Sequence, residues 1–195
     1  MGMLKIAKDP GKKTDNYKNK KSTENLIRYV TRENDAYTEA KRAELKSWGV
    51  YGAVKALGVE HIIDTFEEVQ QISRISTSRK LGPKMFHEEY ILDDDEIEFF
   101  SGKSDVVLAD FASKCTRQYF DLGFQVVYAV HKPSVQNGKD DKSRIHIHIA
   151  GNAVNFKNGK KWHSNINEDQ RAREAVMNAE YLKIKNKCIS PIQFE

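Results

Sequence analysis

The run Ile145-His146-Ile147-His148-Ile149 constrains the fold of this 195-residue chain more than any other segment. Its strict alternation predicts a strand with isoleucines on one face and both histidines on the other, because successive side chains of a strand point to opposite faces. The β-rich pattern continues to Val154, and a second β-rich run, 124–130, precedes it and ends at His131. Two such runs joined by a polar segment are typical of a hairpin, so we expect an antiparallel sheet that carries histidines.

Apolar spacing and turn residues predict the other elements. Residues 104–122 form the clearest helix, with Ser104 as its cap and Gly123 as its end, and the pattern over 36–48 ends in the same way at Gly49. The expected helices are 23–33, 36–48, 59–74, 104–122 and 168–187, the other expected strands are 4–7 and 85–92, and the acidic run 93–98 is expected to be a loop or a helix start. This order indicates the α+β class, with a central antiparallel sheet flanked by helices.

Composition is typical of a globular protein. Hydrophobic residues make up 39% of the chain and charged residues 31%, which is enough for a core and too polar for a membrane protein. No run reaches the ~18–20 apolar residues of a spanning helix, and residues 1–13 contain no apolar stretch of signal-peptide length. We therefore expect a single cytoplasmic domain over 1–195, as the N-terminal part of a longer protein. Cys115 and Cys188 predict neither a disulfide framework nor a cysteine metal site.

The charge distribution favours a polyanionic partner only weakly. The formal net charge is +4 and the isoelectric point is about 8.9, a balance that many proteins share. Lysines crowd the segments 12–21 and 157–161. Because such runs are equally typical of a solvated surface, charge alone does not identify nucleic acid as the partner.

The histidines indicate a metal site. His146 and His148 would lie ~6.5–7 Å apart along one strand face, and a hairpin would set His131 beside them. A nitrogen-rich site without cysteine suits Zn, Mn, Co or Ni, and Mg less tightly. Asn152 falls on the same face, where its amide would orient a ligand or a phosphate. The alternative is a pair of polar side chains on a half-exposed strand. The remaining histidines in strand or helix patterns, His61 and His87, are expected to be structural.

The stretch from His131 through His146-Ile-His148-Ile-Ala-Gly-Asn152 resembles the histidine motif of the HUH endonucleases. More closely, it resembles the motif of conjugative relaxases in the MobP/MobL-like groups of Gram-positive mobile elements. The turn Asn158-Gly159-Lys160-Lys161-Trp162-His163 is similar to the turn that follows the motif in those proteins, and residues 24–33 resemble their tyrosine-bearing segment. The resemblance covers residues 23–163. The gap between His131 and His146 is longer than usual, and 36–82 is longer than a minimal relaxase needs.

The resemblance implies a palm-like α+β domain that nicks DNA by transesterification. A tyrosine hydroxyl would attack one phosphodiester at an origin of transfer, forming a 5′-phosphotyrosine and freeing a 3′-OH. A divalent metal, Mn²⁺ or Mg²⁺, held by His131, His146 and His148 would polarise the phosphate. The implied partners are single-stranded DNA at the origin of transfer with an adjacent hairpin, accessory relaxosome proteins and a coupling protein, with no membrane.

The resemblance also selects the nucleophile among the eight tyrosines. Tyr29 occupies the family position, with Arg28 and Arg32 beside it to hold phosphates and favour the phenolate. From spacing alone Tyr29 would instead be a core aromatic of its helix. Glu88 and Glu89 are candidate proton acceptors.

The turn after the motif is a candidate DNA contact. Its basic and aromatic residues suit phosphates and one stacked base. The residues concerned are Lys160, Lys161, Trp162 and His163, and Asn152 joins them as a candidate. The alternative interpretation is an ordinary solvated turn.

Two other functions remain open at this point. A rolling-circle replication initiator uses the same chemistry at a replication origin. A non-catalytic nucleic-acid-binding module would use the histidines to hold a structural zinc. A covalent protein–DNA product would exclude the second of these, and the identity of the cleaved origin would exclude the first.

Overall fold

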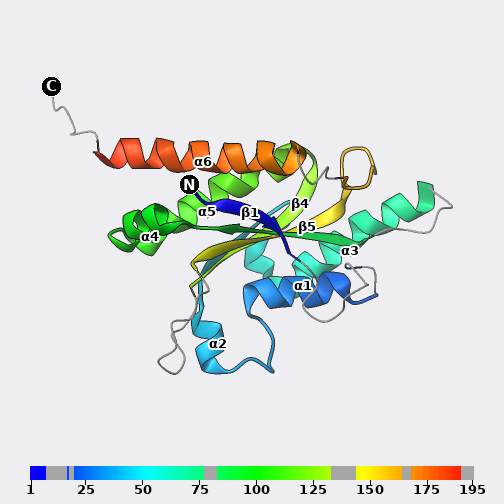
Figure 1. The fold of residues 1–195 in the computed structure, drawn as a ribbon. Coiled ribbons are helices and arrows are strands. Elements are labelled where there is room, and N and C mark those ends of the chain that lie inside the picture. Colours follow the sequence, from blue (N-terminus) through cyan, green and yellow to red (C-terminus); the bar gives the residue numbers. More distant parts are fainter. Residues whose placement is uncertain (8–16, 18–19, 77–82, 133–143, 164–167, 190–195) are drawn as a thin grey trace.

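A five-stranded antiparallel sheet forms the centre of the protein (Figure 1). The structure is a computed structural model that describes residues 1–7, 17, 20–76, 83–132, 144–163 and 168–189. The strand order is β1-β3-β5-β4-β2. The strands are β1 (Met3–Ile6), β2 (Leu45–Tyr51), β3 (Met85–Ile91), β4 (Phe124–His131) and β5 (His146–Asn155). The α+β class and the central antiparallel sheet are therefore confirmed.

The central hairpin is the one that the sequence predicts. β4 and β5 pair antiparallel, with His131 opposite His146 at one end and Phe124 opposite Asn155 at the other. β3 lies on the other side of β5 and pairs Glu89 with His148. The histidine-bearing strand is thus the middle strand of the sheet, which explains why its apolar face is a continuous β-branched run.

Helices cover both faces of the sheet (Figure 1). One face carries α5 (Asp105–Asp121) and α6 (Glu168–Ile189), which bury the isoleucines of β5 together with Tyr90 and Tyr119. The other face carries α1 (Ser22–Thr31) and α3 (Gly58–Ser76), whose apolar residues pack on Val127, Ala129 and Ala150. Each of these four helices begins and ends within two residues of its predicted bounds. None of the described helices combines the length and the apolar character needed to cross a membrane.

The predicted helix over 36–48 is wrong. The structure has a short helix there, α2 (Glu39–Ala43), and then the edge strand β2, which pairs with β4. Gly49 does not end a helix but lies inside β2, where a Cβ atom would overlap the ring of Tyr128. The partner strand therefore overrides the local helix pattern, because pairing and packing decide the structure of a half-buried segment.

The sequence predicts either a loop or a helix start for the acidic run 93–98, and the structure shows a helix start. Asp93 caps α4 (Asp94–Ser101) through a capping box with Glu96, in which each side chain accepts from the other residue's backbone N–H. Glu96 is fully buried and also accepts from the hydroxyl of Tyr90. A short 3-10 turn over Lys55–Leu57 completes the elements.

Candidate metal and nucleophile site

The face of the sheet under α1 carries a cluster of imidazoles and one carboxylate. Strand alternation places His87 and Glu89 of β3, His131 of β4, and His146 and His148 of β5 on this face, at the end of the sheet where β4 stops and β5 begins. The histidine cluster that the sequence predicts is therefore present.

His146 and His148 face each other through their Nε2 atoms, which lie 3.0 Å apart. Nδ1 of His146 donates to the carbonyl oxygen of Arg144 at 2.7 Å. Nδ1 of His148 lies 3.2 Å from Oε1 of Glu89 and 2.9 Å from Nε2 of His87. If both Nδ1 atoms carry the protons in these contacts, the two Nε2 lone pairs converge, and a cation between them would satisfy both. A separation of about 3 Å is also what two nitrogens at about 2.0–2.1 Å from one ion give at a right angle.

His131 completes the group of three. Its Nε2 donates to the carbonyl oxygen of Val30 at 2.7 Å, which leaves Nδ1 as the acceptor, and the Arg32 guanidinium donates to that atom at 3.1 Å. One ligand atom from each of His131, His146 and His148 lies within 4.8 Å of the others. The residues fit a metal ion, with His131 exchanging its contact with Arg32 for the ion.

Burial favours the neutral form of His87, His131 and His148, which is the form that binds metal. It lowers the pKa of His87 to about 4 and, together with the neighbouring His148 and Arg32, that of His131 to about 2. The pKa of His148 is also lowered well below the ordinary histidine value by burial.

His87 lies in this cluster rather than in a purely structural position. Its Nε2 faces His148, and its Nδ1 lies 2.9 Å from the hydroxyl of Tyr17, which is buried. His87, Glu89 and His148 form a second group with metal-ligand geometry. The signal in the sequence is the His87/Glu89 spacing on β3, but it becomes informative only with the register that sets Glu89 opposite His148.

The two candidate acids lie on opposite faces of the sheet. Glu89 is at the site, whereas Glu88 is buried on the other face, where Arg173 donates to it at 2.5 and 3.1 Å and Tyr119 at 2.6 Å. Glu88 is therefore part of the ionic core under α6 and has no contact with the histidines.

Tyr29 packs on the histidine cluster from the last turn of α1. Its ring centre lies 5.4 Å from that of His148, 6.2 Å from His87 and 6.5 Å from His131, edge to face in each case. The Arg32 guanidinium carbon lies 5.0 Å from the ring centre. Burial raises the pKa of Tyr29, and the charge of Arg32 opposes that rise. The structure thus brings together the tyrosine and the histidines that the sequence singles out.

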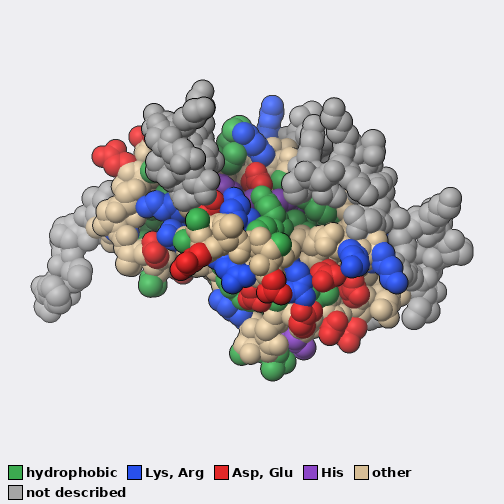
Figure 2. Space-filling model, turned by 90° about the horizontal axis from the view of Figure 1, so that it is seen from below, with side chains coloured by type: hydrophobic (Ala, Val, Ile, Leu, Met, Phe, Trp, Pro, Cys, Tyr) green, Lys and Arg blue, Asp and Glu red, His purple; other side chains and the backbone are tan. Residues whose placement is uncertain are grey.

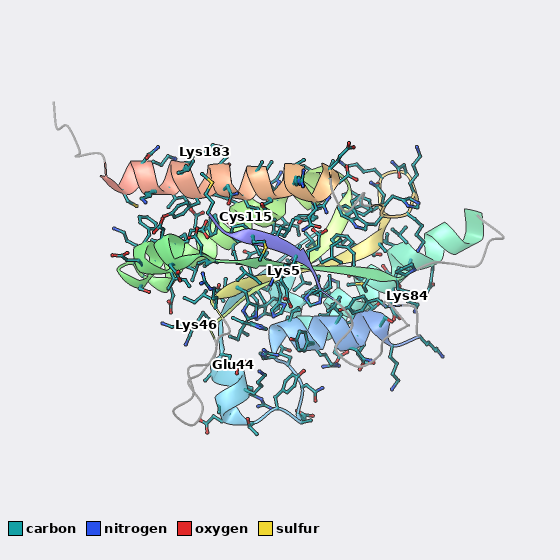
Figure 3. The ribbon with its side chains drawn as sticks, in the orientation of Figure 1. Lys5, Glu44, Lys46, Lys84, Cys115 and Lys183 are labelled. Atoms are coloured by element: carbon teal, nitrogen blue, oxygen red, sulfur yellow. The ribbon has the colours of Figure 1, made fainter. Side chains whose placement is uncertain are left out.

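The two arginines beside Tyr29 have different surroundings. Arg32 is buried, adopts the left-handed backbone conformation with φ 57°, and pairs with Glu44 at 3.0 Å next to His131. Figure 3 shows Glu44 at the end of α2, so this ion pair connects α2 with the site. Arg28 points instead toward Glu24 and Glu60, with which it forms ion pairs near the surface.

Asn152 lies on the expected face but away from the histidines. It is fully buried, donates to the carbonyl of Phe66 at 2.9 Å and to Gln125 at 2.8 Å, and accepts from the backbone of Val154. These contacts join α3 to the sheet and use the whole amide, so nothing of this side chain faces a phosphate.

The turn with Lys160, Lys161, Trp162 and His163 lies at the other end of β5, where Lys161 bridges Val154. Trp162 packs on the α6 face, stacked on Phe86 at 4.2 Å between ring centres and at 4.9 Å from the Arg173 guanidinium carbon. The indole is half-buried, and with Lys160, Lys161 and His163 it lines a pocket of about 490 Å³. Lys160 and His163 remain exposed.

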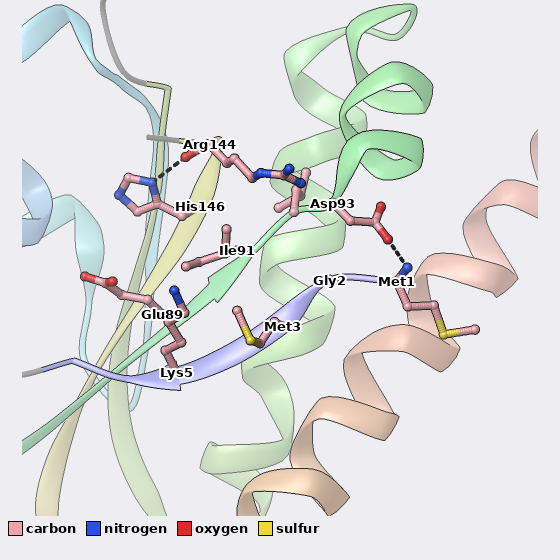
Figure 4. Close-up of a pocket in the computed structure, with 10 residues that line it drawn as sticks. Met1, Gly2, Met3, Lys5, Glu89, Ile91, Asp93, Arg144 and His146 are labelled. Carbon is pink, nitrogen blue, oxygen red and sulfur yellow. Dashed lines mark hydrogen bonds and ion pairs between the residues drawn. The ribbon is translucent and has the colours of Figure 1, made fainter. Parts of the chain in front are cut away.

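A pocket of about 430 Å³ opens beside His146, at the β1 edge of the sheet (Figure 4). Its wall consists of residues from β1, from the end of β3 and from the start of β5, with Glu89 and His146 on the side of the cluster.

Comparison with known protein families places most of the chain in one family. The family described as relaxase, MobA/VirD2-like, nuclease domain matches residues 37–181 of the 195. This range contains all the histidines of the cluster and begins after Tyr29 and Arg32. Comparison with curated proteins and with solved structures found no match.

Proposed function

Because the chain belongs to the MobA/VirD2-like family of relaxase nuclease domains, we propose that it nicks one DNA strand at an origin of transfer and later rejoins it through a covalent 5′-phosphotyrosine. The observation that carries this proposal is the packing of Tyr29 on the histidine cluster, at 5.4 Å from His148. A structural zinc module would have no use for a tyrosine there.

Tyr29 is the nucleophile in this proposal. Its oxygen forms a bond to the phosphorus, the bond from phosphorus to the 3′-oxygen breaks, and the proton lost by the phenol is balanced by the proton gained by the 3′-oxygen. Arg32 supports the attack because its charge lowers the pKa of the tyrosine and stabilises charge on the phosphate.

The histidines hold the scissile phosphate in place. His131, His146 and His148 would hold a divalent ion, Mn²⁺ or Mg²⁺, which would supply Lewis-acid polarisation of the phosphate oxygens. Glu89 and His87 contact Nδ1 of His148 and so keep its Nε2 atom turned toward His146.

The substrate is single-stranded DNA in the bacterial cytoplasm, with an adjacent hairpin at the origin of transfer. Accessory relaxosome proteins and a coupling protein are the expected partners. A rolling-circle initiator would share the site, and the two functions differ in which origin the protein cuts. The exposed Lys160 and His163 lie far from the histidines, so we assign them to DNA outside the cleaved segment.

Adduct mapping tests the proposal. Wild-type protein, Mn²⁺ and a single-stranded oligonucleotide from the element's origin of transfer should give a covalent product that survives denaturation, with the nucleotide on the peptide containing Tyr29. Tyr29→Phe should bind the oligonucleotide and form no adduct. The matched control is Tyr37→Phe, since Tyr37 also stacks on Arg32 but has no ring contact with the histidines among the described residues. An adduct on another tyrosine contradicts the assignment of Tyr29.

A further inference from the structure

The histidine cluster contains a second set of ligand atoms, which uses the other ring nitrogen of His148. Nε2 of His87 and Nδ1 of His148 lie 2.9 Å apart. Oε1 of Glu89 lies 3.2 Å from that Nδ1 atom and 3.8 Å from Nε2 of His87. Three atoms at about 2.0–2.2 Å from a common ion have separations of this size. The spacing of the three atoms therefore suits one metal ion.

The neighbouring side chains allow all three atoms to bind an ion at once. Nδ1 of His87 lies 2.9 Å from the hydroxyl of Tyr17, and a neutral ring with its proton there keeps the lone pair on Nε2. If His148 binds through Nδ1, its proton is on Nε2, which lies 3.0 Å from Nε2 of His146. That atom is an acceptor when Nδ1 of His146 donates to the carbonyl of Arg144. In this arrangement each ring N–H has an acceptor.

The set is buried except on the side of its carboxylate. His87 and His148 are 3% and 1% exposed, and the ring of Tyr29 packs on both. The side chain of Glu89 is 26% exposed and borders the pocket at the β1 edge, so an ion would enter from there. Lys5 lies opposite Glu89 in the register of β1 and β3, and Figure 4 shows its side chain extending toward that carboxylate. Lys5 is thus the cation that a metal ion would replace.

The ligand types indicate which metals would bind. Two imidazoles and one carboxylate are the protein ligands of some catalytic zinc sites and of non-haem Fe²⁺ sites. Mn²⁺ is lowest in the affinity order of the first-row divalent ions, and Mg²⁺ prefers oxygen ligands. The set therefore favours Zn²⁺ or Fe²⁺ over the ions proposed for the three-histidine group, His131, His146 and His148.

We propose that His87, Glu89 and His148 form a second metal position, which takes Zn²⁺ or Fe²⁺ and excludes an ion from the three-histidine group. A neutral imidazole has one lone pair, so His148 serves one position at a time. When its Nδ1 binds, its Nε2 donates to Nε2 of His146, and two ligand atoms of the three-histidine group are engaged with each other. The ion would thus switch off nicking. That effect rests on the proposed function, whereas the binding of the ion does not.

Titration calorimetry with Zn²⁺ on untagged variants tests the second position. His146→Ala removes a ligand of the three-histidine group only and should still bind one Zn²⁺ per chain. His87→Gln in that background should weaken Zn²⁺ binding at least roughly 100-fold, since a ligand of the second position is lost as well. His61→Ala in the same background, in α3, is the matched control and should leave the affinity unchanged. Unfolding temperatures establish that all variants are folded.

Stoichiometry and activity test the exclusion. Wild type, which has both positions, and His87→Gln, which keeps the three-histidine group, should each bind one Zn²⁺ per chain. Zinc-loaded His87→Gln should form more covalent DNA adduct than zinc-loaded wild type, because its ion has only the three-histidine group to occupy. Two Zn²⁺ per wild-type chain, or equal adduct from the two zinc-loaded proteins, overturns the exclusion.

The remaining outcomes separate the second position from the proposed function. A folded His146→Ala variant that binds no Zn²⁺, or equal Zn²⁺ binding by the two double variants, overturns the second position, while an adduct on Tyr29 with Mn²⁺ alone leaves the nicking function standing. Zn²⁺ binding by His146→Ala that is lost with His87→Gln supports the second position even if wild type forms no adduct, a result that overturns nicking and with it the switch.

Discussion

At the scale of single residues, proton positions on the imidazoles decide what the cluster can bind. Nδ1 of His146 donates to a backbone carbonyl, and that of His148 faces Glu89 and His87. The Nε2 atoms of the two residues converge, 3.0 Å apart. A ligand histidine whose second nitrogen is held in this way has a fixed tautomer and ring orientation, which is how proteins tune metal affinity.

Replacement of the ligands should abolish metal binding without unfolding the protein. His146→Ala and His148→Ala should each lose calorimetric Mn²⁺ binding and cleavage, because each removes one of the three nitrogen ligands. EDTA should stop wild-type cleavage, and Mn²⁺ should restore it at least as well as Mg²⁺, since imidazole prefers the softer ion. His61→Ala, in α3, is the matched control. Full cleavage in excess chelator would show that the histidines serve another purpose.

Tyr17 should act on the metal site through His87. Its hydroxyl lies 2.9 Å from Nδ1 of His87, whose Nε2 contacts Nδ1 of His148. Tyr17→Phe and His87→Gln should weaken Mn²⁺ binding about 10–100-fold, the usual effect of losing an outer partner of a ligand. Titration calorimetry measures this directly. Unchanged affinity in both variants would mean that Glu89 alone orients His148.

At the scale of elements, the sequence predicts structure best where the alternation of residue types by itself shows which side chains share a face. The alternation of β5 fixes which side chains share the histidine face, and the hairpin follows from two adjacent β-rich runs. β2 is missed because a half-buried edge strand mixes polar and apolar residues and follows a helical turn, Glu39–Ala43, without a break. The sequence does not distinguish Glu89 from Glu88 as the acid at the site, because the choice depends on the register between β3 and β5.

The side on which Trp162 packs is likewise not evident from the sequence. Its indole stacks on Phe86, on the α6 face of the sheet. Trp162→Ala should therefore destabilise the fold, by about 3 kcal/mol for the lost stacking on Phe86 and Arg173, and should leave the oligonucleotide affinity of the folded protein nearly unchanged. Chemical denaturation and fluorescence anisotropy measure the two quantities. A large loss of oligonucleotide affinity with unchanged stability would instead show that Trp162 contacts DNA.

At the scale of the whole molecule, the two faces of one sheet have different tasks. The α1 face holds the histidine cluster and Tyr29, and the surface on that side carries acidic and basic side chains interspersed (Figure 2). The α6 face is locked by Arg173, Glu88 and Tyr119, all buried. Stability and chemistry are thus assigned to opposite sides of the same strands, within a few ångströms of each other.

Two adjacent carboxylates test this division. Glu88→Gln leaves the Arg173 guanidinium buried without its counter-charge, which should lower the free energy of unfolding by about 3–5 kcal/mol, while metal affinity of the folded protein stays near wild type. Glu89→Gln should do the reverse, since that side chain is 26% exposed and touches His148: stability changes little, and Mn²⁺ binding weakens about 10–100-fold. Denaturant melts and titration calorimetry on both variants measure the two effects. If each substitution lowered both stability and metal affinity, the two faces would be coupled. Stability and metal binding could then not be assigned to opposite faces of the sheet.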